Sequence, residues 1–215
     1  MAKLTTKERI VVEALRLFNE QGYEAVTTAA LAAHLGMAEG NLWYHFKTKR
    51  ALLDAIGARY AKVIEARISQ APGEDAVASY ALLLETMMAE FRAFRFLYRD
   101  QRSYGQLAET IERNARQWTQ RTIDQLEHYL AALVDAGLLD WPRERLHDVA
   151  INATIILRYG LEHYREMGDL VGEGSGSVRR TLLRHLTLFE HRLEPGAAER
   201  LHAAIERIGQ QALAA

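Results

Sequence analysis

The sequence contains no cysteine and only 3 prolines among its 215 residues. Without cysteine the chain cannot form disulfide scaffolds, zinc–thiolate sites, iron–sulfur clusters or cysteine nucleophiles. Hydrophobic residues make up 49% of the chain and charged residues 26%, a composition typical of a folded core rather than of a disordered or collagen-like chain. The length allows one large domain or two smaller ones.

Long apolar runs are lacking as well. Residues 1–9 have no apolar stretch of the kind that a secretory signal peptide requires. No later segment approaches the roughly 18 uncharged apolar residues of a membrane span. We therefore expect a soluble, cytoplasmic protein that does not contact a membrane.

Neither sign of charge predominates, because the formal net charge is −1. Residues 1–50 contain 7 basic and 5 acidic side chains, so this segment is slightly positive and the remainder of the chain slightly negative. Such a distribution permits a basic, nucleic-acid-binding tip on an acidic body but does not by itself predict one.

Apolar residues recur at helical spacing along almost the whole chain, and no segment alternates with a period of two for long. The sequence therefore predicts an all-α protein. The first helix is expected to begin at the capping-box spacing of Thr5 and Glu8 and to end near Gly22. Further helices are expected at about 28–34, 39–46, 48–69, 76–95, 96–107, 108–136, 143–167, 178–192 and 197–213.

The second and third of these helices are short and are joined at Gly36, a residue that can adopt the positive φ of a tight turn. This is the arrangement of a helix-turn-helix motif, which directs the first residues of its second helix into the major groove of DNA. Leu42 and Phe46 are expected in the core, whereas Asn41 and Tyr44 lie on the opposite, polar face.

The run from Gly40 to Lys49, with Leu35-Gly36 and Val26-Thr27-Thr28 upstream, resembles the TetR family of one-component bacterial repressors over about residues 5–56. The resemblance implies a homodimer with an N-terminal helix-turn-helix DNA-binding domain at residues 1–50. The fourth helix would join it to a helical bundle within residues 51–215 that binds a small molecule and dimerises. On this interpretation the protein is not an enzyme and needs no cofactor or metal.

The resemblance also implies roles for individual residues in binding double-stranded operator DNA. Hydroxyls and lysines suit phosphate oxygens, and an asparagine amide can pair with adenine. Phosphate contacts are expected from Thr27, Thr28, Tyr44, His45 and Lys49, with Lys47 as a further cation. The base edges are expected to face Ala38, Glu39, Gly40 and Asn41.

A second set of polar and aromatic residues is expected to line a cavity for the inducer. Asn152 and Arg158 interrupt an otherwise apolar helix, and a buried polar group there would need an inducer or another helix as its partner. The segment from Phe94 to Asp100 also resembles a stretch found in one subgroup of the family. The candidates are Phe94, Tyr98, Arg99, Tyr104, Trp118, Asn152, Arg158 and Tyr159.

Each of two apolar stripes could form either part of the core or part of the dimer interface. They could form a four-helix contact across a twofold axis, or they could face the interior of one chain. The sequence leaves both possibilities open for Leu146, Val149, Ile156, Leu161, Leu182, Leu183, Leu186 and Phe189.

The leading interpretation is therefore a ligand-responsive transcriptional regulator, most simply a repressor, that binds a palindromic operator as a homodimer and is released by an inducer. An activator with the same head is possible on this sequence. The alternative from another class is a di-metal carboxylate enzyme, because Glu-x-x-His occurs twice, at residues 144–147 and 199–202, and such pairs hold metals in helical bundles.

Overall fold

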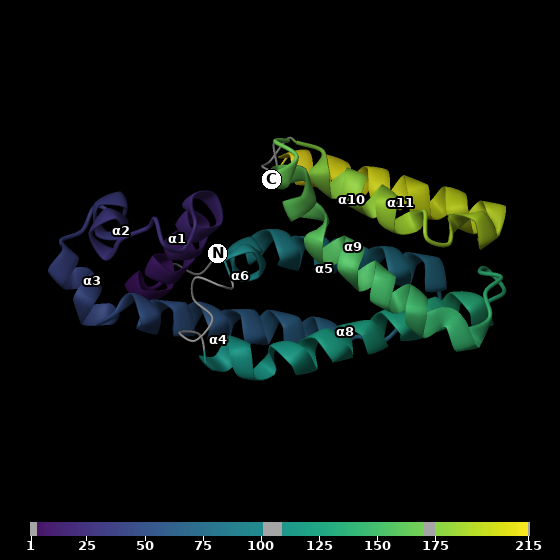
Figure 1. Cartoon of the computed structure of the whole chain (residues 1–215), viewed down its shortest axis with the longest axis horizontal. Helices are drawn as coiled ribbons and strands as arrows, with labels where there is room; N and C mark the ends of the chain where they lie inside the picture. The colour runs from purple at the N-terminus through teal and green to yellow at the C-terminus, as the bar shows by residue number, and fades with distance from the viewer. Residues whose placement is uncertain (1–3, 101–108, 170–174, 215) are drawn as a thin grey trace. The chain divides into compact units, whose positions relative to one another are not determined.

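The computed structural model describes residues 4–100, 109–169 and 175–214. The regular elements of these residues are helical, which confirms the predicted all-α class, and a single isolated bridge joins Leu139 to Leu193. In chain order they are α1 (Thr6–Gln21), α2 (Thr28–His34), α3 (Glu39–His45), α4 (Lys49–Ile68), α5 (Ala76–Ala93), α6 (Arg95–Arg99), α8 (Glu109–Asp135), η2 (Arg143–Arg145), α9 (Leu146–Glu166), α10 (Ser177–Leu186), η3 (Glu190–Arg192) and α11 (Pro195–Ala214) (Figure 1).

Two compact units make up the chain. The first combines residues 1–65 with 90–116, and the second combines 66–89 with 117–215. Both α4 and α5 therefore contribute residues to each unit. The predicted boundary after residue 50 falls inside the first unit, and as a division of function it stays a prediction.

The first unit begins with the predicted capping box. The backbone N–H of Thr5 donates to the Glu8 carboxylate at 2.8 Å, and the Thr5 hydroxyl accepts from the Glu8 N–H at 3.2 Å. These two bonds satisfy backbone groups that the first helical turn leaves open. Helix α1 ends at Gly22, whose φ is +95°.

The helix-turn-helix motif forms where the sequence predicts it. Thr27 caps α2 by accepting a hydrogen bond from the Ala30 N–H at 3.1 Å, and Gly36 turns the chain toward α3 with a φ of +65°. Leu31 and Leu42, one from each helix, are 1% exposed. Their burial holds the two short helices together and leaves the opposite side of α3 free.

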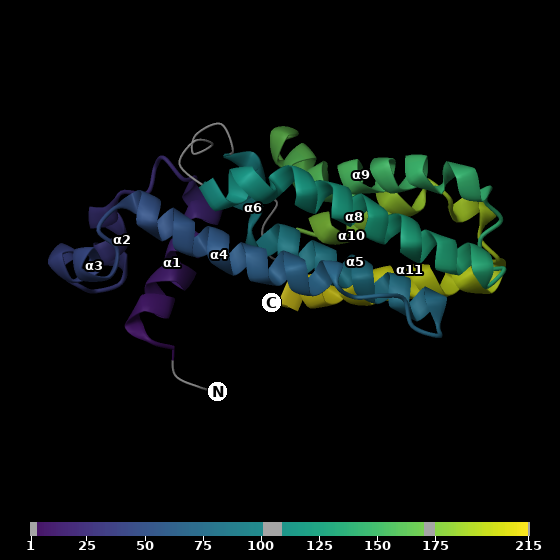
Figure 2. The same ribbon diagram turned by 90° about the horizontal axis from the view of Figure 1, so that it is seen from below.

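The second unit is a helical bundle in which α10 packs against both α9 and α11, and α10 and α11 lie side by side (Figures 1 and 2). Of the two apolar stripes, most residues belong to the core of this unit: Leu146, Val149, Leu161, Leu182, Leu186 and Phe189 are buried. Ile156 and Leu183 are half-buried. Most of both stripes thus faces the interior of one chain.

Two predicted helices differ from the structure. The helix expected at 178–192 is divided, because Leu188 and Phe189 bond to carbonyls only three residues back and the turn brings the Phe189 ring fully inside, 6.0 Å from the ring of Tyr80. The helix expected at 96–107 is α6 as far as Arg99, and residues 101–108 lie outside the described residues. In the described ranges no helix is long and apolar enough to span a membrane.

Candidate nucleic-acid interface

Helix α3 presents one polar and aromatic face. Leu42 is buried, whereas Tyr44 is 85% exposed and Asn41 is also exposed. Trp43, which the sequence prediction did not include among the DNA contacts, is 41% exposed. The residues before and in the first turn of α3 that were predicted to face base edges, Ala38, Glu39 and Gly40, are all exposed as well. The face is therefore accessible to a large, flat or grooved partner.

The start of α3 is tied to the start of α2. The Thr28 hydroxyl donates to the Glu39 carboxylate at 2.9 Å. Thr27 uses its hydroxyl oxygen for the α2 cap, so its predicted phosphate contact would have to come from the remaining donor. A methyl group at Gly40 would meet no atom within 4 Å, so packing within the chain does not require glycine there.

Lys49 has an internal partner that its position in the motif does not reveal. Its ammonium donates to the backbone carbonyl of Tyr23 and lies 4.1 Å from the centroid of the Tyr23 ring. Burial lowers the pKa of Lys49 from its ordinary value. The side chain thus ties the start of α4 to the chain that follows α1, whereas Lys47 is exposed and His45 is half-buried beside Tyr44.

The structure brings some of the predicted ligand-binding residues together in the first unit. Phe94 is buried with its ring 5.1 Å from that of Tyr60, and the hydroxyls of Tyr60 and Tyr98 lie 2.5 Å apart. Arg99 points instead to α1, where it donates to the carbonyls of Phe18 and Asn19. Tyr104 lies outside the described residues.

The other described candidates lie in the second unit, and they differ in how deeply they are buried. Trp118 is buried, and Arg158 donates to the Thr119 hydroxyl at 2.9 Å. Asn152 is exposed and Tyr159 is 47% exposed, so the argument that Asn152 is a buried polar group in need of a partner is wrong. Ala150, Ala153 and Leu157 face the core, whereas Asn152 and Ile155, three residues apart on α9, are both exposed.

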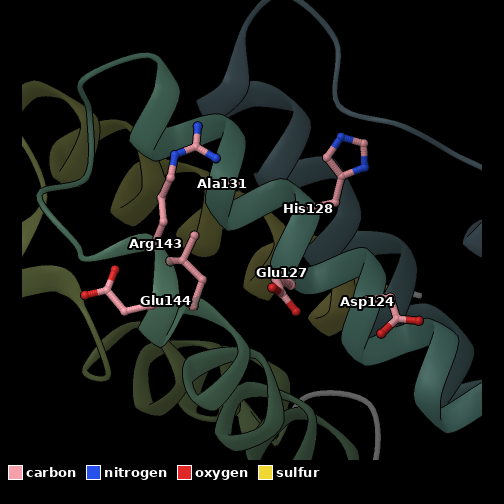
Figure 3. Close-up of a pocket in the computed structure, with 7 residues that line it drawn as sticks. Asp124, Glu127, His128, Ala131, Arg143 and Glu144 are labelled. Carbon is pink, nitrogen blue, oxygen red and sulfur yellow. The ribbon is translucent and has the colours of Figure 1, made fainter.

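Two hollows in the second unit are lined by none of these predicted residues. One, of about 580 Å³, lies between α8 and the start of α9, and the other, of about 160 Å³, lies between α5 and α11. Figure 3 shows the larger hollow, where Asp124 and Glu127 project from α8 and His128 projects away from them. Glu144, from the first Glu-x-x-His pair, lies across the hollow.

The two Glu-x-x-His pairs form separate surface contacts. Nδ1 of His147 lies 2.7 Å from the Glu127 carboxylate, which raises the pKa of His147. Nε2 of His202 lies 3.3 Å from the carboxylate of Glu190. Among the residues that the structure describes, no three acidic or histidine side chains gather as a metal site would require.

Comparison with known proteins identifies the chain. Residues 10–56 match the family model described as bacterial regulatory proteins of the tetR family, and residues 59–201 match the model described as a bacterial transcriptional repressor. These matches define the class, a bacterial helix-turn-helix transcription regulator. The chain belongs to the TetR family. Because this is a family of regulators, the alternative prediction of a di-metal enzyme is wrong.

Individual relatives cover less of the chain. The tetracycline repressor protein class D of Escherichia coli is 36% identical over 46% of this chain and 44% of its own length, and the class C protein is 33% identical over 44% and 41%. The chain thus spans less than half the length of these curated relatives. A TetR-family regulator from Marinobacter aquaeolei has a TM-score of 0.77 at 24% identity, covering 95% of this chain and 99% of the other, which shows the shared fold.

Proposed function

We propose that this chain is a repressor that binds a palindromic operator as a homodimer and leaves it when a small molecule binds. The observation that carries the proposal is the two-sided α3, with Leu42 inside and Asn41 and Tyr44 outside. A helix of this kind fits the major groove, and two copies related by a twofold axis read two half-sites. Because bacterial DNA lies in the cytoplasm, this function places the protein there.

The proposal assigns separate tasks to the exposed residues. The Asn41 amide can donate to and accept from an adenine edge, so it would read sequence, whereas the Tyr44 hydroxyl and the Lys47 ammonium would hold phosphates. Thr28, Glu39 and His45 flank this set. Lys49 would act mainly by fixing the head, since its ammonium already donates to Tyr23.

We expect Asn41→Ala to reduce discrimination between the preferred duplex and competitor about tenfold, because one bidentate base contact is lost. Tyr44→Phe should weaken binding to all duplexes by a similar factor at low salt, since a phosphate contact carries no sequence information. The measurement is duplex selection from a random pool with the full-length protein, followed by binding titrations of each variant.

The matched control is Gln210→Ala, which replaces an exposed amide side chain of α11 in the second unit. It should bind like the original protein. Unchanged preference in Asn41→Ala together with unchanged affinity in Tyr44→Phe would contradict the roles given to α3.

The dimer is proposed to use the side of α9 that the core leaves uncovered. Ile155 is 52% exposed, Tyr159 is 47% exposed and Met167, just after the helix, is 70% exposed. Their spacing places Ile155 and Tyr159 on one face. A second copy of the chain would cover this face.

Ile155→Glu is expected to shift the protein to monomers at micromolar concentration, because it places a charge inside the proposed interface. Analytical ultracentrifugation measures this directly. Leu82→Glu is the control, since Leu82 is an exposed leucine of α5 and is 58% exposed. Equal sedimentation of both variants and the original protein would remove α9 from the interface.

The inducer is proposed to change the relative populations of two dimer conformations, one that fits the operator and one that does not. It can shift their equilibrium only by the difference between its affinities for the two. Phe94 and Tyr98 belong to the predicted ligand set, and the structure brings both of their rings next to the ring of Tyr60. An apolar or aromatic small molecule suits such surroundings.

A further inference from the structure

We propose that Arg99 and Asp100 are positioning residues for DNA binding, which hold the recognition head in the orientation that fits one half-site spacing. The inference rests on the proposed function and adds to it a specific link between α6 and the head. Both side chains are largely buried, with 11% of Arg99 and 14% of Asp100 exposed. All the contacts that carry the inference lie within the first unit.

Arg99 binds the end of α1. One terminal nitrogen donates to the Asn19 carbonyl at 2.9 Å, and the other donates to the Phe18 carbonyl at 2.7 Å. The Phe18 carbonyl also accepts the N–H of Gly22, at 3.0 Å. The last carbonyls of a helix carry the negative end of its dipole, so a guanidinium is favourable there. Arg99 therefore caps α1 from a helix more than 70 residues further along the chain.

Asp100 connects Arg99 to the turn that follows α1. Its carboxylate accepts from Nε of Arg99 at 2.6 Å and from the backbone N–H of Tyr23 at 2.7 Å. The carbonyl of that same Tyr23 accepts from the Lys49 ammonium. A continuous series of hydrogen bonds thus runs from α6 through Tyr23 to Lys49, the first residue of α4, which is four residues after the end of α3.

Other groups fix the same junction. Asn19 accepts from the Phe96 N–H at 2.9 Å and donates to the Ala93 carbonyl at 2.8 Å, and Arg95 donates to the Asn19 carbonyl at 2.8 Å. The rings of Phe18 and Phe96 lie 5.3 Å apart. Several side chains therefore join α6 to the end of α1, and the inference is that these contacts fix the orientation of the recognition head.

The test compares duplexes that differ only in the distance between their half-sites. A dimer with fixed heads fits one spacing, and looser heads tolerate others at the cost of affinity. The duplex selected by the original full-length protein is resynthesised with one base pair added or removed at its centre. The ratio of dissociation constants between the altered and selected duplexes is then measured for Arg99→Lys and Asp100→Asn.

Arg99→Lys keeps the charge but cannot contact two carbonyls and a carboxylate at once, and Asp100→Asn keeps the shape but removes the charge. We expect each variant to bind the selected duplex about tenfold more weakly. The ratio of the dissociation constants for the altered and selected duplexes should fall several-fold. Arg59→Lys is the matched control, because Arg59 is an exposed arginine of α4 in the same unit. This control variant should keep the original affinity for the selected duplex and the original ratio of dissociation constants.

A general loss of folded protein would weaken all duplexes equally and leave the ratio unchanged, so an unchanged ratio in Arg99→Lys and Asp100→Asn overturns the inference. Hydrogen exchange at the Tyr23 amide gives an independent readout, and it should accelerate in Asp100→Ala, which removes the oxygen that accepts the Tyr23 N–H. Exchange at the original rate would also overturn the inference. If the original protein selects no paired half-sites, the proposed function itself fails and this inference fails with it.

Discussion

Replacement of Tyr80 by alanine is expected to lower the free energy of unfolding by about 3–5 kcal/mol, the usual cost of removing a large buried aromatic side chain. Tyr80 is 0% exposed. Its ring lies 6.0 Å from the ring of Phe189 and its hydroxyl lies 2.7 Å from Nε2 of His185. The substitution would remove both packing and a buried hydrogen bond from the centre of the second unit.

Tyr80→Phe separates the two contributions. It preserves the ring and leaves Nε2 of His185 without its partner, so about 1–3 kcal/mol should be lost. Chemical denaturation of both variants measures the difference. Tyr44→Ala is the control for the alanine substitution, because Tyr44 is 85% exposed and should change stability by less than about 0.5 kcal/mol. Equal effects of alanine at positions 44 and 80 would contradict the core that the structure assigns.

Acidification is expected to destabilise the second unit through His185. This side chain is 0% exposed, and burial lowers its pKa from 6.5 to about 3. Below pH 6.5 the unfolded chain binds a proton at this position that the folded chain excludes. Stability therefore falls as the pH decreases from 6.5 toward 3, by up to about 1.4 kcal/mol per pH unit.

The comparison of the original protein with His185→Gln isolates this contribution. Glutamine does not titrate and can still bond to the Tyr80 hydroxyl. Carboxylates whose pKa is lowered in the folded state, such as Glu13 and Asp75, also reduce stability in acid, but they are present in both proteins and cancel. Denaturation series at several pH values should show that the original protein loses more stability below pH 6.5 than the variant does. A constant difference would show that His185 is not excluded from protonation.

The features predicted correctly from the sequence are those that depend on neighbouring residues. The capping box at Thr5 and Glu8 lies within one helical turn, and the turn at Gly36 requires only a residue that tolerates positive φ. The core positions of Leu42 and Phe46 follow from helical periodicity. Local signals of this kind were sufficient for the helix-turn-helix head and for most helix boundaries.

The features that were missed depend on contacts between distant parts of the chain. Helical spacing shows that Asn152 shares a helix with apolar residues but not which face of that helix the bundle covers. The internal contact of Lys49 depends on the carbonyl of Tyr23, 26 residues away. Arg99 was predicted as a candidate for the inducer cavity, and its hydrogen bonds to the carbonyls at the end of α1 were not predicted.

The composition of the first unit from two separate stretches of chain has a practical consequence for chimeric regulators. A graft of only the first 50 residues onto another family member would leave the end of α1 without Arg99 and the Phe18 ring without Phe96. A graft that also transfers residues 90–100 would carry these partners with it. Exchange of operator preference between relatives should therefore succeed more often when both stretches are transplanted together.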